Sequence, residues 1–188
     1  MGEPAKRRAT YEDVLRAPAH MVAEIIEGDL VLSPRPGPLQ ALATTKLVSV
    51  LGPRFGGKDG GWIILIEPEL HLGPHVLVPD LAGWRRSHLS SLPQESFFTQ
   101  APDWVCETLS PSTEKYDRGN KLGIYAAEGT AHAWFLNPTQ RTLEVMALRS
   151  KVPPRWELRG VYRDDAKVTD EPFTDGEFAL DLGALWAM

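Results

Sequence analysis

The sequence predicts an α/β domain with a mixed central β-sheet and helices packed on it. The expected order of elements is a helix, a hairpin, a second helix, three strands, a third helix and two strands, which is typical of such a domain. The 16 glycines and 16 prolines imply many turns and argue against an all-helical bundle. A chain of 188 residues suits one domain. Domains of this size bury roughly 70% of their unfolded surface, which is enough for a core without cross-links.

Composition and charge narrow the classes of function. With 43% hydrophobic and 24% charged residues, the chain fits a globular protein and not collagen, a coiled coil or a disordered chain. The 20 basic and 25 acidic residues give a net charge of −5, which argues against a broadly basic nucleic-acid binder. The single cysteine, Cys106, excludes an intrachain disulfide and a cysteine-built zinc site. Without an apolar leader or a run of ~20 apolar residues, we expect a cytoplasmic protein with no membrane contact.

The N-terminal part is expected to begin with a flexible polar tail over residues 1–9, and the domain to span 10–188. A short helix is expected over 11–16. Two apolar runs around the turn dipeptide Gly28–Asp29 then predict a hairpin over 23–34.

The middle of the chain alternates a long helix with strands. Leucine and valine residues on one stripe predict a helix over 39–55. Two apolar, β-rich runs predict strands over 62–72 and 75–84, joined by a turn at Gly73–Pro74. A third run predicts a strand over 103–110.

A third helix is expected over 112–129, where Gly129 suits the C-terminal end because glycine readily adopts a left-handed conformation. Two more strands are expected over 131–138 and 141–148. Weaker patterns predict a further strand and then a closing strand with a short helix: 155–163 and 178–188.

Two acidic residues stand inside apolar runs and are the first candidates for chemistry. Asp80 follows a proline in VLVPDLAGW, and Glu107 lies in WVCETLS. A buried carboxylate costs several kcal/mol unless it is paired or binds a metal, and a divalent cation relieves the repulsion between two of them. Such oxygen ligands suit Mg²⁺ or Mn²⁺. The alternative is that strand alternation points either acid toward water.

Two further charged residues are candidates for the same site. Lys121 lies in the helix after the Glu107 strand, near the strand end where open α/β sheets place their sites. Alternatively, it is a surface lysine paired with Asp117 at i,i+4. Glu24 lies in the hairpin sequence AEIIEG, where the alternative is a solvated side chain.

Other residue types add little to this set. The five histidines lack a metal-binding spacing, and the chain has neither a phosphate-binding glycine loop nor a nucleophile elbow. Glu67 and Glu69 flank Pro68, and alternation along a strand predicts that the two acids share one face. One of them could then approach a metal, or both could face solvent.

Three segments carry a family resemblance: EIIEGDLVLSPRP, then VLVPDLAGW, then the run from APDWVCETLSPST to RTLEVMAL. Together they resemble the Uma-two family, a bacterial domain of unknown function that is usually labelled a restriction endonuclease and belongs to the PD-(D/E)XK nuclease-like superfamily. The resemblance covers residues 10–185, and its most specific part is ETLSPST followed by D-x-x-x-K-x-x-x-Y. It implies a restriction endonuclease-like fold, with a mixed central sheet flanked by helices and an active centre where the sheet splays.

The resemblance also implies which residues form the site. Asp80 matches the aspartate of the family's PD motif, and Glu107 matches the acid of its E-x-LSPST motif. Lys121 matches the lysine of the following helix. Glu24 matches the acid of the E-x-x-x-G hairpin.

The chain departs from the wider pattern at two places. The superfamily motif E-x-K would put a lysine where this chain has Leu109, so the lysine function falls to Lys121 on the helix. Many members of the family have a histidine before a glutamine at the start of the long helix. Here Leu39 precedes Gln40, which leaves the role of Gln40 open.

The implied reaction is metal-dependent hydrolysis of nucleic-acid phosphodiester bonds. Asp80, Glu107 and the Thr108 carbonyl would hold Mg²⁺ or Mn²⁺, and Glu24 would be a further ligand, directly or through water. Lys121 would orient the attacking water and offset charge on the phosphorane. The alternatives are a catalytically silent nucleic-acid-binding module of the same fold and an interaction protein whose acids are structural.

The expected partners are a nucleic acid, most simply DNA, and a second copy of the chain. A homodimer is expected because cutting two strands commonly needs two active centres. The apolar segments 178–188 and 133–136 are candidate contact surfaces, or alternatively parts of the core.

Overall fold

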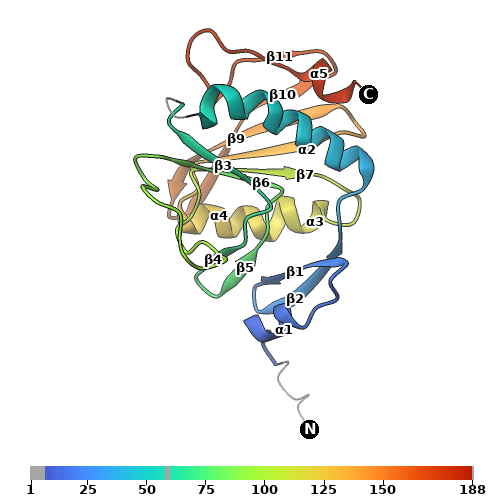
Figure 1. Cartoon of the computed structure of the whole chain (residues 1–188), viewed down its shortest axis with the longest axis vertical. Helices are drawn as coiled ribbons and strands as arrows, with labels where there is room; N and C mark the ends of the chain where they lie inside the picture. The colour runs from blue at the N-terminus through green and yellow to red at the C-terminus, as the bar shows by residue number, and fades with distance from the viewer. Residues whose placement is uncertain (1–6, 58–59, 188) are drawn as a thin grey trace.

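Two β-sheets of unequal size organise the chain, and the larger one forms its centre (Figure 1). The computed structural model describes residues 7–57 and 60–187. The larger sheet has six strands: β3 (Trp62–Ile66), β6 (Leu81–Arg85), β7 (Trp104–Thr108), β8 (His132–Asn137), β9 (Thr142–Lys151) and β10 (Pro154–Arg163). Their order is β10-β9-β8-β7-β6-β3, and only the β7–β8 pair is parallel.

The smaller sheet includes the N-terminal hairpin and has four strands in the order β2-β1-β5-β4. These are β1 (Met21–Ile26), β2 (Asp29–Pro34), β4 (Leu70–Leu72) and β5 (His75–Leu77). Two short strands form a third pair near the C-terminus, β11 (Lys167–Val168) and β12 (Leu180–Asp181).

Helices lie on both faces of the six-stranded sheet (Figure 1). One face carries α2 (Pro38–Leu51), which continues into the π-helical turn η1 (Gly52–Gly56), and the C-terminal α5 (Leu182–Trp186). The other face carries one continuous helical stretch made of α3 (Glu114–Tyr116), the π-helical turn η2 (Asp117–Lys121) and α4 (Leu122–Glu128). A short N-terminal helix, α1 (Tyr11–Leu15), lies beside the hairpin.

Alternation along the central strand β7 divides the core into two layers. Trp104 and Cys106 point toward α2, whereas Val105 packs on the side of α4. Burial raises the pKa of the Cys106 thiol well above its usual range, so this cysteine remains a thiol within the core. The expected mixed sheet flanked by helices is confirmed.

The prediction of two long strands before β7 is wrong in one respect, because each of these segments is broken in the middle. The chain leaves the larger sheet after β3, forms β4 and β5 in the smaller sheet, and returns at β6. Pro68 and Pro79 lie at the two crossings, where the missing N–H group interrupts a strand ladder. Glu67 adopts a left-handed φ of 46° at the first crossing, which turns the chain sharply.

The hairpin turn also lies one residue earlier than expected. The two residues between β1 and β2 are Glu27 and Gly28, with φ values of 54° and 89°. Positive φ at both central positions is the signature of a two-residue type I′ turn, whose twist matches the right-handed twist of the flanking strands. Asp29 therefore begins β2 and does not lie in the turn.

Both segments considered as dimer contact surfaces contribute buried side chains to this chain's own core. Leu180, Leu182 and Leu185 are buried against α2, and Trp134 and Phe135 are buried in β8. Most of the tail expected over 1–9 lies outside the described residues, and at its end Ala9 donates a backbone hydrogen bond to Gly28. Within 7–57 and 60–187, no helix is long and apolar enough to cross a bilayer.

The packing of α2 on the sheet gives a direct test of the core. Leu47 is fully buried, whereas Leu39 on the same helix is 47% exposed. We predict that Leu47→Ala lowers the free energy of unfolding by about 2–5 kcal/mol, and that Leu39→Ala changes it by about 0.5 kcal/mol or less. Urea unfolding followed by tryptophan fluorescence measures both, and equal effects would contradict this packing.

Candidate active site

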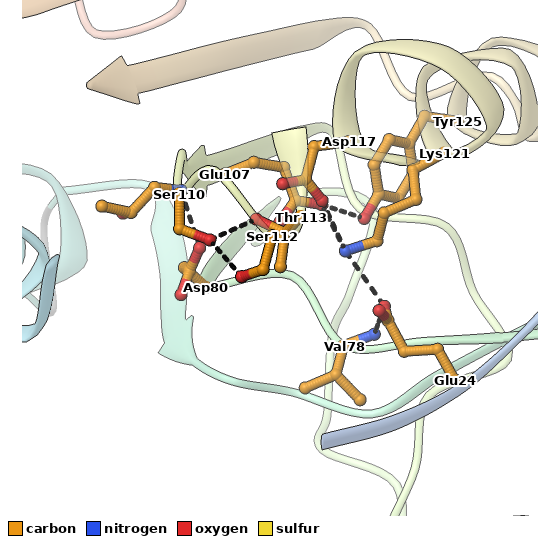
Figure 2. A network of polar contacts seen from close by, with 11 residues as sticks. Glu24, Val78, Asp80, Glu107, Ser110, Ser112, Thr113, Asp117, Lys121 and Tyr125 are labelled. Atoms are coloured by element: carbon orange, nitrogen blue, oxygen red, sulfur yellow. Dashed lines mark hydrogen bonds and ion pairs between the residues drawn. The ribbon is translucent and has the colours of Figure 1, made fainter. Parts of the chain in front are cut away.

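The candidate residues come together where the two sheets part, at the C-terminal end of β7. Asp80 lies between β5 and β6, immediately after the second crossing proline. Glu107 is in β7, Glu24 is in β1, and Lys121 ends the π-helical turn η2. All four line one cleft of about 130 Å³. Figure 2 shows the Lys121 ammonium meeting Glu24 and Glu107, with Asp80 to one side of them.

Asp80 is held against the end of β7. Its Oδ2 accepts a hydrogen bond of 2.6 Å from the backbone N–H of Thr108. Burial raises the pKa of Asp80 to about 6, while the Thr108 N–H and the Lys121 ammonium act in the opposite direction. Asp80 is therefore a carboxyl group that titrates just below neutral pH.

Lys121 is a buried ammonium group surrounded by carboxylates. Its Nζ lies 3.0 Å from Glu24 Oε1, 3.1 Å from Glu107 Oε1 and 3.2 Å from Asp117 Oδ1. Burial alone would lower its pKa, but Glu107 and Glu24 outweigh burial and raise the pKa well above the usual range. The i,i+4 pair with Asp117 does form, yet the lysine is only 3% exposed and is not a surface residue.

Glu107 is fixed by two partners on the helix above it. Its Oε1 accepts a 2.7 Å hydrogen bond from the phenol of Tyr125 and also contacts the Lys121 ammonium (Figure 2). Burial and the neighbouring acids raise the pKa of Glu107 well above its usual range, and Lys121 opposes them. Burial, and after it the same carboxylate, raises the pKa of the Tyr125 hydroxyl, so that the phenol remains a donor.

Glu24 joins the smaller sheet to this cluster. Its Oε1 accepts a 2.8 Å hydrogen bond from the backbone N–H of Val78 and contacts Lys121. Val78 directly precedes the proline at the second crossing. Glu24 therefore ties β1 both to this crossing and to the helical lysine.

Asp117 and Tyr125 belong to the site, although our reading of the sequence did not select them. Asp117 is buried and lines the cleft, and Tyr125 is buried behind Glu107. The signal was the spacing: positions 117, 121 and 125 follow each other at i,i+4, which places them along one face of a helix. The interruption by a π-helical turn is typical of helices near functional sites.

Polar side chains surround the mouth of the cleft. Ser110 Oγ lies 2.9 Å from Ser112 Oγ and 3.1 Å from Thr113 Oγ1, in the segment that joins β7 to α3. Gln40 also lines the cleft, whereas the neighbouring Leu39 is 47% exposed. The Thr108 side chain points away, toward α2, where its Oγ1 lies 2.8 Å from Thr44 Oγ1.

Glu67 and Glu69 do not share one environment, so the prediction from strand alternation is wrong. Glu67 lines the cleft and pairs with Arg35, whose Nη1 lies 3.2 Å from Glu67 Oε2. Glu69 does not line the cleft and instead accepts a 2.8 Å hydrogen bond from the Tyr11 hydroxyl. The left-handed turn at Glu67 breaks the strand, and alternation therefore does not extend across it.

The donor set at the β7 end fits a hard divalent cation with few protein ligands. Among the described residues, no group of three or more His, Cys, Asp or Glu side chains forms a ready metal cage. Mg²⁺ commonly takes only one or two carboxylates and keeps water or substrate phosphates as its other ligands. Asp80 and Glu107 supply two such carboxylates to the lining of the cleft.

Comparisons with known proteins identify first the fold and then the family. The chain is 23% identical to a protein whose crystal structure is described as "a putative nuclease belonging to DUF820 from Anabaena variabilis ATCC 29413". The likeness covers 95% of this chain and 97% of that one with a TM-score of 0.76, which establishes the restriction endonuclease-like fold. The family model Uma2, "Putative restriction endonuclease", matches residues 9–183, and the chain belongs to this family. No curated protein sequence matches.

Removing the central cation should destabilise the protein. We predict that Lys121→Met lowers the free energy of unfolding by about 3–5 kcal/mol at pH 8, because three buried carboxylates lose their common partner. Urea unfolding measures the change. Lys115→Met, at an exposed position of the same helical stretch, is the matched control. Equal stabilities of the two variants would contradict the buried cluster.

The raised pKa of Asp80 predicts a pH-dependent stability. Its pKa of about 6 in the folded protein exceeds the ordinary 3.8, so ionisation costs folding energy that grows above pH 4 and levels off above pH 6. The whole cost is on the order of 3 kcal/mol at most. In metal-free buffer, Asp80→Asn should therefore match the wild type near pH 4 and be more stable at pH 8. A stability difference that does not change with pH would contradict this assignment.

Proposed function

We propose that this protein is a nuclease that hydrolyses nucleic-acid phosphodiester bonds with the help of Mg²⁺ or Mn²⁺. The observation that carries the proposal is the buried cluster at the end of β7, where one ammonium lies within 3.0–3.2 Å of three carboxylates beside a fourth, Asp80. Membership in a family described as "Putative restriction endonuclease" supports the same reaction class.

The proposed roles follow from the position of each side chain. Asp80, Glu107 and the backbone carbonyl of Thr108 would hold the cation, which when bound polarises the scissile phosphate and lowers the pKa of a water. Glu24 stays a predicted further ligand, directly or through water. Its Oε1 is occupied by Val78 and Lys121, which leaves the other oxygen for that role.

Lys121 would act on the reacting phosphate. An ammonium fixed by surrounding carboxylates can orient the attacking water and offset the charge that develops on the phosphorane, and losing such a group typically costs ~10²–10³ in rate. Asp117 and Tyr125 hold this arrangement from the helix side, because they contact Lys121 and Glu107 respectively. DNA is the simplest substrate and a homodimer the simplest assembly for cutting two strands, and both belong to this proposal.

A catalytically silent nucleic-acid-binding module remains the second candidate function. The observation that favours it is the charge: the chain is net acidic, and Leu39 stands where the family often has a histidine. Such a module would keep the metal site and the fold but would release no cleaved product.

Metal titration and cleavage test the proposal together. We expect Mn²⁺ titration heats with the wild type that disappear in Asp80→Asn and Glu107→Gln, because each variant removes one of two carboxylate ligands. Plasmid and single-stranded DNA incubated with Mn²⁺ or Mg²⁺ should be cut by the wild type only. Glu157→Gln, an exposed acid on β10, is the control that should keep both properties.

The two readouts separate the candidate functions. Mn²⁺ binding that depends on Asp80, without any cleavage, would favour the silent module. Titration heats that are unchanged in both variants would show that the metal ligands are wrongly assigned.

A further inference from the structure

The cleft contains a second cation whose surroundings differ from those of Lys121. Seven charged side chains line the cleft, namely Glu24, Glu67, Asp80, Glu107, Asp117, Arg35 and Lys121. Lys121 is 3% exposed and is held by three carboxylates, whereas the Arg35 side chain is 53% exposed and pairs with Glu67. Among the described residues that line the cleft, Arg35 is thus the accessible cation.

We propose that Arg35 binds a phosphate of the substrate strand and that the Glu67 carboxylate holds the guanidinium until the phosphate takes the place of this carboxylate. This inference rests on the proposed function, because it assumes that a phosphodiester enters the cleft. A guanidinium can donate two parallel hydrogen bonds to phosphate oxygens, which a lysine cannot do in the same geometry.

The pair with Glu67 is suited to exchange. Arg35 Nη1 and Glu67 Oε2 are 3.2 Å apart, and both side chains are partly exposed, 53% and 34%. Exposed ion pairs contribute little to stability, so the guanidinium can leave its partner at small cost. By contrast, the Lys121 ammonium could not leave its three carboxylates without stranding buried charges.

The backbone around Arg35 is held in place. Residues 34–38 read Pro-Arg-Pro-Gly-Pro and connect β2 to α2 along the edge of the cleft. Each proline fixes its own φ, and a residue before proline is restricted to extended conformations. The exchange therefore needs a movement of the Arg35 side chain only, while its Cα stays beside the cleft.

The backbone of Glu67 is also held in place. Glu67 donates its backbone N–H to the carbonyl of Asp80 at 3.0 Å, so the carboxylate that holds Arg35 is anchored next to a proposed metal ligand. Glu67 also contributes to the negative potential on Asp80. An incoming phosphate at Arg35 would thus be placed beside the metal ligands, as the reaction requires.

The test is a double-mutant cycle on the binding of a short, fluorescein-labelled, single-stranded oligodeoxynucleotide. Fluorescence anisotropy measures the affinity of each variant in a buffer that contains Ca²⁺. A denaturing gel after each titration confirms that the probe is intact. We expect Arg35→Gln to weaken binding about tenfold, the loss of one charge-assisted hydrogen-bonding group. The slope of log Kd against log salt concentration should fall by about 0.7, as for one phosphate contact fewer on a single strand.

Glu67→Gln should have the opposite effect and tighten binding several-fold, because it removes the internal competitor for Arg35. In the Arg35→Gln background the same change should have a much smaller effect. Arg149→Gln removes an arginine from another exposed pair, with Glu157, at the opposite end of the large sheet. This control should bind the probe as the wild type does, and thermal melting verifies that all variants are folded.

The outcomes are distinguishable from those of the proposed function. Binding that depends on Arg35, in a protein that cleaves nothing in Mn²⁺, would keep this inference and refute hydrolysis. Equal affinities and salt slopes for Arg35→Gln and Arg149→Gln would overturn the inference. So would a wild type that does not bind the probe.

Discussion

The buried ammonium of Lys121 is the interaction on which the arrangement of the site depends. It draws together side chains from β1, β7 and the η2 turn, which belong to separate sheets and to a helix. Without this shared partner, the carboxylates would repel each other in a poorly solvated cleft. Burial raises the pKa of Asp80 at the end of β7, and the negative charges of Asp117 and Glu67 add to this shift.

Much of the fold and of the site could be predicted from local sequence. Asp80 and Glu107 were identifiable because acids inside apolar runs are costly unless something compensates them. The long helix, the hairpin and the β7–β8–β9 order follow from periodicity and turn residues. Lys121 and Glu24 were also candidates, but pattern alone could not separate them from surface residues, and the family resemblance then favoured both.

What could not be predicted depends on long-range geometry. The broken strands at Pro68 and Pro79 arise because the chain crosses between two sheets, and no local pattern reveals which sheet a short strand joins. The contacts of Tyr125 with Glu107 and of Arg35 with Glu67 join segments that are distant in the sequence, and only the fold brings them together. Helical spacing puts Tyr125 on the same helix face as Lys121, but only the fold shows that its partner is Glu107.

The single parallel pair in the large sheet has a consequence for how this active centre could change over time. Two parallel neighbours require a crossover connection, and here the crossover between β7 and β8 is the helix that carries Lys121. The position of Lys121 is therefore set by this helix and not by the strand that carries Glu107. Residues of β7 can be substituted without displacing the Lys121 ammonium. A one-residue insertion in the connecting helix, by contrast, would rotate Lys121 away from the carboxylates that it contacts.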